Sequence, residues 1–272
     1  MDTPLSRGDN IPLTEEEEEF MADKYEQFGH VVGMLGALML STRPDIAYCV
    51  GQVRQYTAFP RRHHYMALKR IVRYVKGTIN FGLVFSKDAA PGIVGYVDAD
   101  HAANVDDRSS VSGTTFLYMG AAFASRSKKQ RGRISGRPRE GETEEDRQKK
   151  ETADAARSSA ESELRALDLG CRDGLWILKL AKAFRMPEGD VPMPVYEDNQ
   201  ACYYIAKSSK WTSATKHVAT MYFAVRDDIL DQRIDLRPVD SKDNLADLFT
   251  KPLRQKNFEK FRLAIGVRDA SV

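Results

Sequence analysis

The chain contains little cysteine. Three residues in 272, Cys49, Cys171 and Cys202, are widely spaced and form no Cys-x-x-Cys pair or Cys/His cluster. An odd number at this spacing argues against a disulfide framework and against a structural zinc site. The cysteine content therefore suits a reducing compartment.

Long apolar segments are also missing. The longest apolar run, residues 31–40, is about half of what a membrane span needs, and we interpret it as a buried helix. No charged-then-apolar leader opens the chain. We therefore expect no membrane partner and an intracellular protein that is not secreted, located in the cytoplasm, a virus-like particle or the nucleus.

An excess of one charge is the third absence. The 41 Lys and Arg residues nearly balance 39 Asp and Glu residues, giving a formal net charge of +2. This balance excludes a polycation that binds nucleic acid through bulk charge, so any electrostatic function requires local segregation of charge. Hydrophobic residues make up 42% of the chain, which is typical of one or two globular domains with a sizeable core.

Changes of composition divide the chain into parts. Residues 1–23 contain an acidic run, Glu15 to Glu19, and are predicted to be a disordered tail. Residues 24–90 begin with apolar residues at helical spacing, interrupted at the prolines Pro44 and Pro60, which predicts two or three helices. A segment at about 130–150 is charged and almost free of apolar residues, which predicts a disordered insertion.

Strand patterns begin after this helical part and later alternate with helices. We predict strands at 82–85, 93–98, 114–118, 122–127, 195–197 and 234–239. We predict helices at 158–184, 200–207, 215–230, 244–250 and 254–265, followed by a short tail at 268–272. Strands first and alternation later indicate an α/β domain with a mixed sheet, preceded by a small helical unit.

One predicted helix, residues 61–76, is strongly basic. Its expected buried side is marked by Tyr65, Leu68, Ile71/Val72 and Val75. Six cations with no acid among them complete the helix: Arg61, Arg62, Lys69, Arg70, Arg73 and Lys76. They are either a solvated helix face or a surface that follows nucleic-acid phosphates.

Four acids are candidates for chemistry. Asp98 and Asp198 each follow an apolar strand, where a carboxylate is costly to bury without a metal or a base, although turn and cap roles are common there. Glu161 has a structural role available in a Ser-x-x-Glu capping box, while Glu163 is rotated about 200° from it toward the core side. Asp247 lies in a short amphipathic helix and has a solvated alternative.

The order of these acids, together with several motifs, resembles the ribonuclease H domain of copia-type (LTR) retrotransposon polyproteins. The matching stretches are Tyr96-Val97-Asp98-Ala99-Asp100, Ser127-Lys128-Lys129-Gln130, Ser158-Ser159-Ala160-Glu161-Ser162-Glu163, Glu197-Asp198-Asn199-Gln200 and Leu245-Ala246-Asp247 with Thr250-Lys251-Pro252-Leu253. Upstream, Leu40-Ser41-Thr42-Arg43-Pro44-Asp45 and Lys69-Arg70-Ile71-Val72-Arg73-Tyr74 resemble the region that joins reverse transcriptase to ribonuclease H. The similarity covers residues 25–267 apart from the insertion.

The resemblance implies a fold and a reaction. Residues 91–267 would form a ribonuclease H-like fold, with a five-stranded mixed sheet flanked by helices, and residues 24–90 a connection- or thumb-like unit. The reaction would be cleavage of the RNA strand of RNA–DNA hybrids with two Mg²⁺ ions, or with Mn²⁺. Other parts of a retrotransposon polyprotein, reverse transcriptase and integrase, would be partners.

The resemblance also assigns roles to residues. Asp98 would bridge both ions, Glu163 and Asp198 would each hold one, and Asp247 would complete the second position. Asn199 and Gln200 are candidates for contacts with the 2′-hydroxyl that distinguishes RNA from DNA.

Three other functions compete with this interpretation of the sequence. A polymerase is rejected, because Ala99 separates the two acids that would be adjacent in a polymerase hairpin. An aspartic protease is not expected, because the sequence contains no Asp-Thr-Gly or Asp-Ser-Gly motif. The serious alternative is an inactive or repurposed fragment that binds RNA or hybrid without cutting it. Two departures from the family keep it open: His101 in place of a usual Trp, and the insertion before Glu163.

Overall fold

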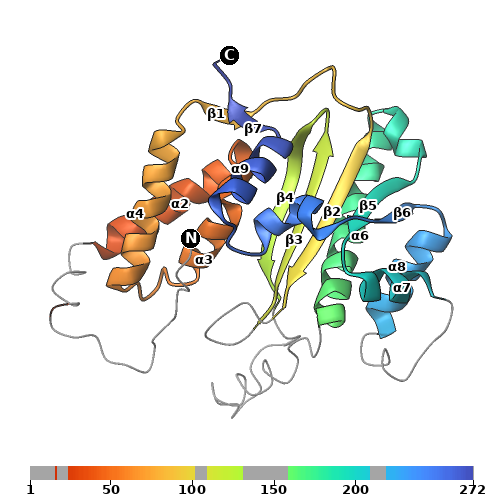
Figure 1. The fold of residues 1–272 in the computed structure, drawn as a ribbon, viewed down its shortest axis with the longest axis horizontal. Helices are drawn as coiled ribbons and strands as arrows, with labels where there is room; N and C mark the ends of the chain where they lie inside the picture. Colours follow the sequence, from red (N-terminus) through yellow and green to blue (C-terminus); the bar gives the residue numbers. More distant parts are fainter. Residues whose placement is uncertain (1–15, 17–23, 102–108, 131–158, 209–218, 272) are drawn as a thin grey trace, which may run out of the picture.

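The computed structural model describes residues 16, 24–101, 109–130, 159–208 and 219–271. Figure 1 shows a helical part beside a larger part built on a sheet. Most of the predicted acidic tail, nearly all of the predicted insertion and Ser158 of the capping box lie outside the described residues. Among the residues that are described, none of the helices is both long and apolar enough to cross a membrane.

A five-stranded mixed sheet forms the centre of the larger part, in the order β4-β3-β2-β5-β6. Strands β2 (Ile93–Asp100), β3 (Val111–Tyr118) and β4 (Ala121–Lys129) are antiparallel neighbours. Strands β5 (Met193–Glu197) and β6 (Ile234–Pro238) extend the sheet in parallel to β2. This sheet confirms the predicted α/β fold with a five-stranded mixed sheet.

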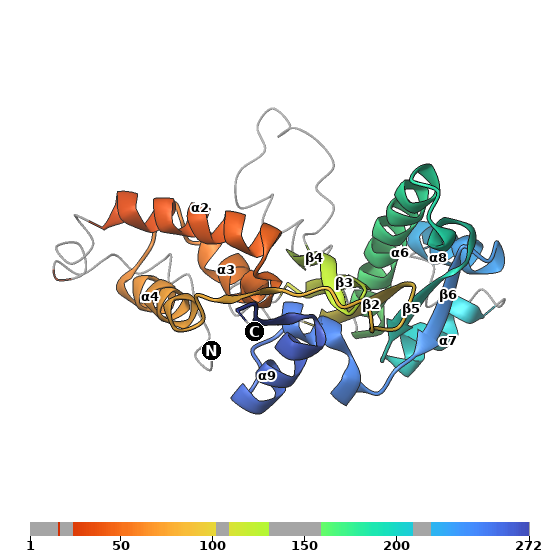
Figure 2. The same cartoon turned by 90° about the horizontal axis from the view of Figure 1, so that it is seen from above.

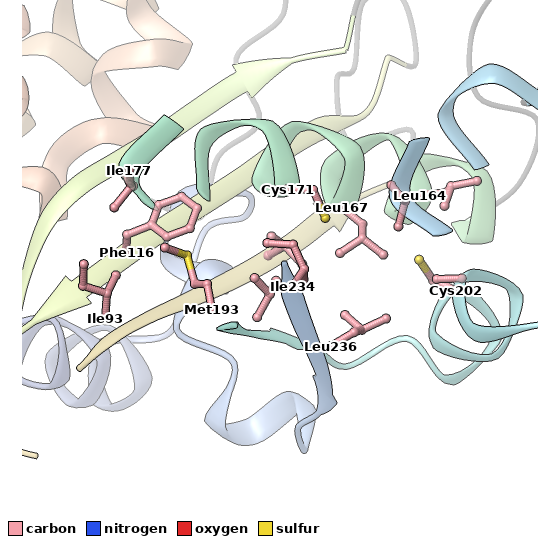
Figure 3. Packing of buried hydrophobic residues seen from close by; sticks show 14 of the residues in the cluster. Ile93, Phe116, Leu164, Leu167, Cys171, Ile177, Met193, Cys202, Ile234 and Leu236 are labelled. Atoms are coloured by element: carbon pink, nitrogen blue, oxygen red, sulfur yellow. The ribbon is translucent and has the colours of Figure 1, made fainter. Parts of the chain in front are cut away.

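Helices cover one face of this sheet and enclose the main core. Helix α6 (Ser159–Ala183) packs on β2 and β3, with α7 (Gln200–Lys207) and α8 (Ala219–Leu230) beside it. Apolar residues at helical spacing on α6, including Leu164, Leu167 and Cys171, meet residues of alternate positions on the strands (Figure 3). The 3-10 helix η2 (Pro187–Asp190) packs against α6 before β5 begins.

The opposite face of the sheet is covered by the end of the chain. After the 3-10 helix η4 (Ser241–Asp243), the 3-10 helix η5 (Leu245–Phe249) lies on β2 and β3, and α9 (Gln255–Ala264) follows. Figure 2 shows α6 and α9 on opposite sides of the strands. The helix predicted at 244–250 is a 3-10 helix, because the amides of Asp247 and Thr250 donate to carbonyls three residues earlier, those of Asn244 and Asp247.

The last described strand corrects another prediction. Strand β7 (Val267–Asp269) pairs antiparallel with β1 (Phe81–Leu83) in a separate two-stranded sheet. Residues 268 and 269 therefore belong to a strand and not to a tail. This pairing ties the segment after the helical part to the end of the chain.

The helical part consists of α2 (Tyr25–Ser41), the 3-10 helix η1 (Pro44–Ile46), α3 (Ala47–Arg54) and α4 (Arg62–Gly77), in agreement with the predicted two or three helices. Its core includes Phe28, Val32 and Leu68. The run at 31–40 is not buried throughout, because Met34 is 54% and Leu40 76% exposed. Only one face of α2 has a packing partner among the helices described.

A buried polar network connects this helical part to α9. Arg43 donates from Nε and Nη2 to the two carboxylate oxygens of Asp45, at 2.9 and 2.8 Å. Its Nη1 donates to the carbonyl of Thr78, and Tyr74 Oη donates to Asp45 Oδ2 at 2.6 Å. Arg262 of α9 donates to the same Tyr74 hydroxyl at 3.3 Å. Because Arg43 and Asp45 are paired with each other and hydrogen-bonded further, these interactions offset the desolvation penalty of burying the two charges.

Candidate metal centre

The predicted acids meet where β2 and β5 end. The two strands run in parallel with Tyr96 paired to Tyr196, and each tyrosine is followed two residues later by an acid, Asp98 or Asp198. This register places both carboxylates at the same edge of the sheet. Asp98 is buried and Asp198 half-buried.

Two overlapping groups of carboxylates form at this edge. Ligand atoms of Asp98, Asp198 and Asp247 lie within 4.8 Å of one another, and so do those of Glu163, Glu197 and Asp198. All four acids predicted from the sequence are therefore brought together. The shared member is Asp198, whereas the resemblance implied that Asp98 would contact both ions.

The end of the chain holds the first group in place. Asn244 donates from Nδ2 to the Val97 carbonyl at 2.9 Å, which fixes η5 against β2 next to Asp98. Thr250 Oγ1 donates a short hydrogen bond to Asp98 Oδ2. Lys251 Nζ lies 2.7 Å from Asp247 Oδ1 and 4.0 Å from Asp98 Oδ2. Thr250 and Lys251 carried part of the family resemblance, but they were not assigned to the site from sequence.

The second group faces α6. Glu163 is buried near the start of this helix, and its carboxylate belongs to the group, as its rotation from Glu161 predicts. Glu161 instead forms an ion pair with Arg165, one turn along the helix, with 2.8 Å between Glu161 Oε1 and Arg165 Nη2. A structural acid and a candidate ligand therefore lie two residues apart.

Glu197 was missed by the sequence reasoning. It is 1% exposed. Like Met193 and Val195, it lies on the buried face of β5, where every second residue is buried. The amide of Asn199 donates to Glu197 Oε1 at 2.9 Å, while Oε2 has no hydrogen-bond partner. Strand alternation was the available signal, because it places residue 197 on the same face as two apolar core residues.

The environment raises the pKa of these carboxyl groups. Burial, followed by the charges of Glu197 and Asp98, raises the pKa of Glu163 to about 10. Burial and the charge of Asp98 raise the pKa of Asp247 to about 7. Burial also raises the pKa of Asp98 and of Glu197. Without a cation, the cluster therefore retains protons at neutral pH.

The donor set fits hard divalent cations. Carboxylate oxygens are the ligands preferred by Mg²⁺, and Mn²⁺ accepts the same donors. Glu163 and Glu197 each have a buried oxygen without a hydrogen-bond partner. A bound cation would give these oxygens a partner and offset the repulsion among the acids.

The predicted RNA-contact residues flank the acids. Asn199 caps α7, since its Oδ1 accepts a hydrogen bond from Cys202 N at 2.9 Å. Gln200 is exposed and lines a pocket of about 450 Å³ together with Asp198, Tyr203 and Tyr204. One of the two candidates thus has a structural role, while the other faces open space next to the carboxylates.

The basic helix lies elsewhere. Helix α4 exposes Arg62, Lys69, Arg70, Arg73 and Lys76, while Arg61 precedes it and is half-buried. Of the predicted apolar stripe, Leu68 and Ile71 are buried, but Val72 is 41% exposed. Figures 1 and 2 both place α4 across the strands from α7 and α8. The structure therefore does not bring this cationic face into the acidic cluster.

Comparison with known proteins identifies relatives along most of the chain. It is 28% identical over 256 residues to the retrovirus-related Pol polyprotein from transposon TNT 1-94 of Nicotiana tabacum, covering 94% of this chain and 17% of that protein. It is 32% identical over 238 residues to the Pol polyprotein from transposon RE1 of Arabidopsis thaliana, covering 86% and 15% respectively. The chain thus spans less than a fifth of these relatives.

No family profile matches the chain. Among solved structures, the N-terminal RNase H domain of a Mycobacterium tuberculosis protein, fused to maltose-binding protein, aligns with a TM-score of 0.38 and 13% identity. That alignment covers 64% of this chain and 99% of the other.

Proposed function

Because the chain is homologous over most of its length to copia-type retrotransposon Pol polyproteins, we propose that it hydrolyses the RNA strand of RNA–DNA hybrids with two divalent cations. The observation that carries this proposal is the convergence of Asp98, Glu163, Asp198 and Asp247 at one edge of the sheet. Mg²⁺ is the proposed ion, and Mn²⁺ its substitute. Reverse transcriptase and integrase segments of a longer polyprotein are the proposed partners.

The carboxylates would hold the ions in two groups that share Asp198. When bound, a pair of divalent ions favours deprotonation of an attacking water and stabilises the departing 3′ oxygen. The protein's own contribution is orientation. Thr250 fixes the Asp98 carboxylate, and Lys251 keeps a positive charge next to Asp247 and Asp98.

The surroundings suit a nucleic-acid strand. The pocket beside Asp198 is lined by the Gln200 amide, which can donate to or accept from a ribose hydroxyl. The exposed ring of Tyr204 lines the same pocket and offers a surface for base stacking. The cations of α4 would contact phosphates of the same duplex farther from the cut.

Cleavage of an end-labelled hybrid tests the proposal. With Mg²⁺ or Mn²⁺, the chain should cut the RNA strand of the hybrid and leave the DNA strand and duplex DNA intact. Asp98→Asn should reduce the rate by about a hundredfold or more, since even residues that only orient metal ligands contribute 10–100-fold. Asp190→Asn removes an exposed carboxylate that pairs with Lys182 and should not change the rate.

Binding of the same hybrid separates the two candidate functions. If the wild-type chain binds the hybrid tightly but cuts it with neither metal, the cleavage proposal is wrong. The chain would then be a fragment that binds nucleic acid without hydrolysing it, for which the basic face of α4 supplies the charge.

A further inference from the structure

Glu197 is a buried acid whose placement requires an explanation. It is 1% exposed, and among the described residues no lysine or arginine forms an ion pair with it. Its Oε1 accepts the Asn199 amide at 2.9 Å, so one oxygen has a structural role. Its Oε2 is buried and has no hydrogen-bond partner. A buried carboxylate oxygen without a partner costs free energy unless a ligand satisfies it.

Glu163 shows the same deficit on the facing helix. It is 6% exposed, and its Oε2 is also buried without a hydrogen-bond partner. Ligand atoms of Glu163, Glu197 and Asp198 all lie within 4.8 Å of one another. Glu163 from α6 and Glu197 from β5 therefore bring their carboxylates to the same third carboxylate, and each has one oxygen without a hydrogen-bond partner. Three carboxylates this close repel one another unless a cation or protons lie between them.

The charges of the whole cluster indicate whether cations or protons balance these carboxylates. Lys251 is on the side of Asp247 and Asp98, at 2.7 and 4.0 Å, and it serves that group. The five carboxylates of the two groups carry five negative charges when ionised. Lys251 and two divalent cations carry five positive charges, so two ions balance the site when all five carboxyl groups are ionised.

We propose that Glu197 is a fifth metal ligand, which holds one divalent cation together with Glu163 and Asp198. The other cation is held by Asp98, Asp198 and Asp247. This inference rests on the proposed two-cation centre and adds to it a ligand that the four-acid resemblance does not contain. Glu197 thereby determines the affinity of the position that faces α6.

Substitution by glutamine separates this role from a structural one. In Glu197→Gln the side-chain carbonyl can still accept the Asn199 amide, so the turn that begins α7 is retained. The charge and the second carboxylate oxygen are lost. Glu161→Gln is the matched control, because Glu161 is also buried, at 7% exposed, but is paired with Arg165 outside both groups.

Binding of Mn²⁺ to the whole chain, without nucleic acid, tests the proposal by calorimetry and by electron paramagnetic resonance of the free ion. The wild-type chain and Glu161→Gln should bind two ions. Glu197→Gln should bind one ion with wild-type affinity and the second roughly tenfold or more weakly. Glu163→Gln should weaken the same ion, and the double variant should lose less than the sum of the two single losses, because both residues hold one cation.

Two results would overturn the proposal: Glu197→Gln binding both ions as tightly as wild type, or the wild-type chain binding at most one ion. The cleavage assay keeps this outcome apart from the proposed function. A chain that binds two Mn²⁺ through Glu197 but cuts no hybrid retains the ligand and loses the nuclease proposal. If the wild-type chain cuts the hybrid but Glu197→Gln binds both ions normally, the nuclease proposal is retained and the Glu197 ligand is lost.

Discussion

At the scale of single residues, the partner of a buried acid distinguishes structure from chemistry. Glu161 and Asp168 are buried on α6, and each forms an ion pair one turn away, with Arg165 or Arg172, at 2.8 Å. Glu163 lies on the same helix, but the charges that act on it are those of other acids, Glu197, Asp98 and Asp198. A carboxylate surrounded in this way is unfavourable in its ionised form, so its stability contribution depends on pH and on metal.

The raised pKa values predict that the metal-free chain loses stability as the pH rises. Glu163, with a pKa of about 10, and Asp247, with a pKa of about 7, keep protons in the folded chain that they lose in the unfolded chain above about pH 4.5. From pH 5 to pH 7 the free energy of unfolding should fall by up to about 1.4 kcal/mol per pH unit for each carboxyl. Above pH 7 Glu163 continues this fall after Asp247 has lost its proton. Urea unfolding with a chelator present measures it.

Substitutions test whether Glu163 causes this pH dependence of the free energy of unfolding. Glu163→Gln should flatten the dependence above pH 7, whereas Asp190→Asn, on the exposed η2, should leave it unchanged. Added Mg²⁺ should stabilise the chain more at pH 8 than at pH 5, since the ion competes with protons for the carboxylates. A stability that rises with pH in the metal-free chain would contradict the burial argument.

The sequence was sufficient to find four of the five clustered acids. Asp98 and Asp198 could be found because each ends an apolar strand, and Glu163 because a rotation of 200° on a helix separates it from Glu161. Glu197 could not be found in the same way, because Asp198 next to it accounts for the same strand end. Strand alternation puts residue 197 on the apolar face of β5, but the packing of α6 on this strand, which brings Glu163 to it, is not given by the sequence.

At the scale of secondary-structure elements, the position of α6 on the sheet depends on a glycine. A Cβ added at Gly170 would lie 2.3 Å from Val97 Cγ1 on β2, which is far inside van der Waals contact. The helix therefore lies closer to the strand that carries Asp98 than a residue with a Cβ at position 170 would allow. This close approach also sets how near Glu163 can come to the strand-end acids.

Gly170→Ala should destabilise the chain by about 1–3 kcal/mol, because the added methyl group forces α6 away from β2. Gly33→Ala is the matched control, since Gly33 is exposed on α2 and a Cβ there meets nothing within 4 Å. That change should stabilise the chain by about 0.5–1 kcal/mol through helix propensity. Chemical unfolding of both variants measures the difference, and equal effects of the same sign would show that α6 can move freely.

Several element boundaries could not be read from the sequence, for local reasons. Strand β3 begins at Val111, whereas the prediction began it at residue 114. The prediction was too short because Ser112 and Gly113 interrupt the apolar alternation in the sequence. Gly113 is needed there since a Cβ would lie 2.6 Å from Thr250 Cγ2 and 2.8 Å from the Ala246 carbonyl. The neighbour that makes this glycine informative is more than a hundred residues away in the sequence.

At the scale of the whole molecule, the helical part and the sheet share structure. Ala47 of α3, Phe81 and Leu83 of β1 pack in the same apolar cluster as Phe261 of α9. The Arg43 network ends on Arg262, and β1 pairs with β7. A predicted division at residue 90 therefore separates segments that form one core.

This shared core predicts that the whole chain unfolds in a single cooperative transition. A fragment of residues 91–272 should have a lower melting temperature, because it loses the β1–β7 pairing and exposes part of that cluster. Calorimetry of both proteins measures this. Equal melting temperatures, or two separate transitions in the whole chain, would instead support independent domains.

The hydrogen bond from Asn244 to the Val97 carbonyl has a consequence for biosynthesis. It joins residues 147 positions apart, and the segment it anchors supplies Asp247, Thr250 and Lys251 to the cluster. Translation proceeds from the N-terminus, so Asp98, Glu163 and Asp198 emerge from the ribosome well before this segment does. A nascent chain halted before residue 244 therefore lacks Asp247, and the order of synthesis would delay completion of the group formed by Asp98, Asp198 and Asp247 until the last segment docks.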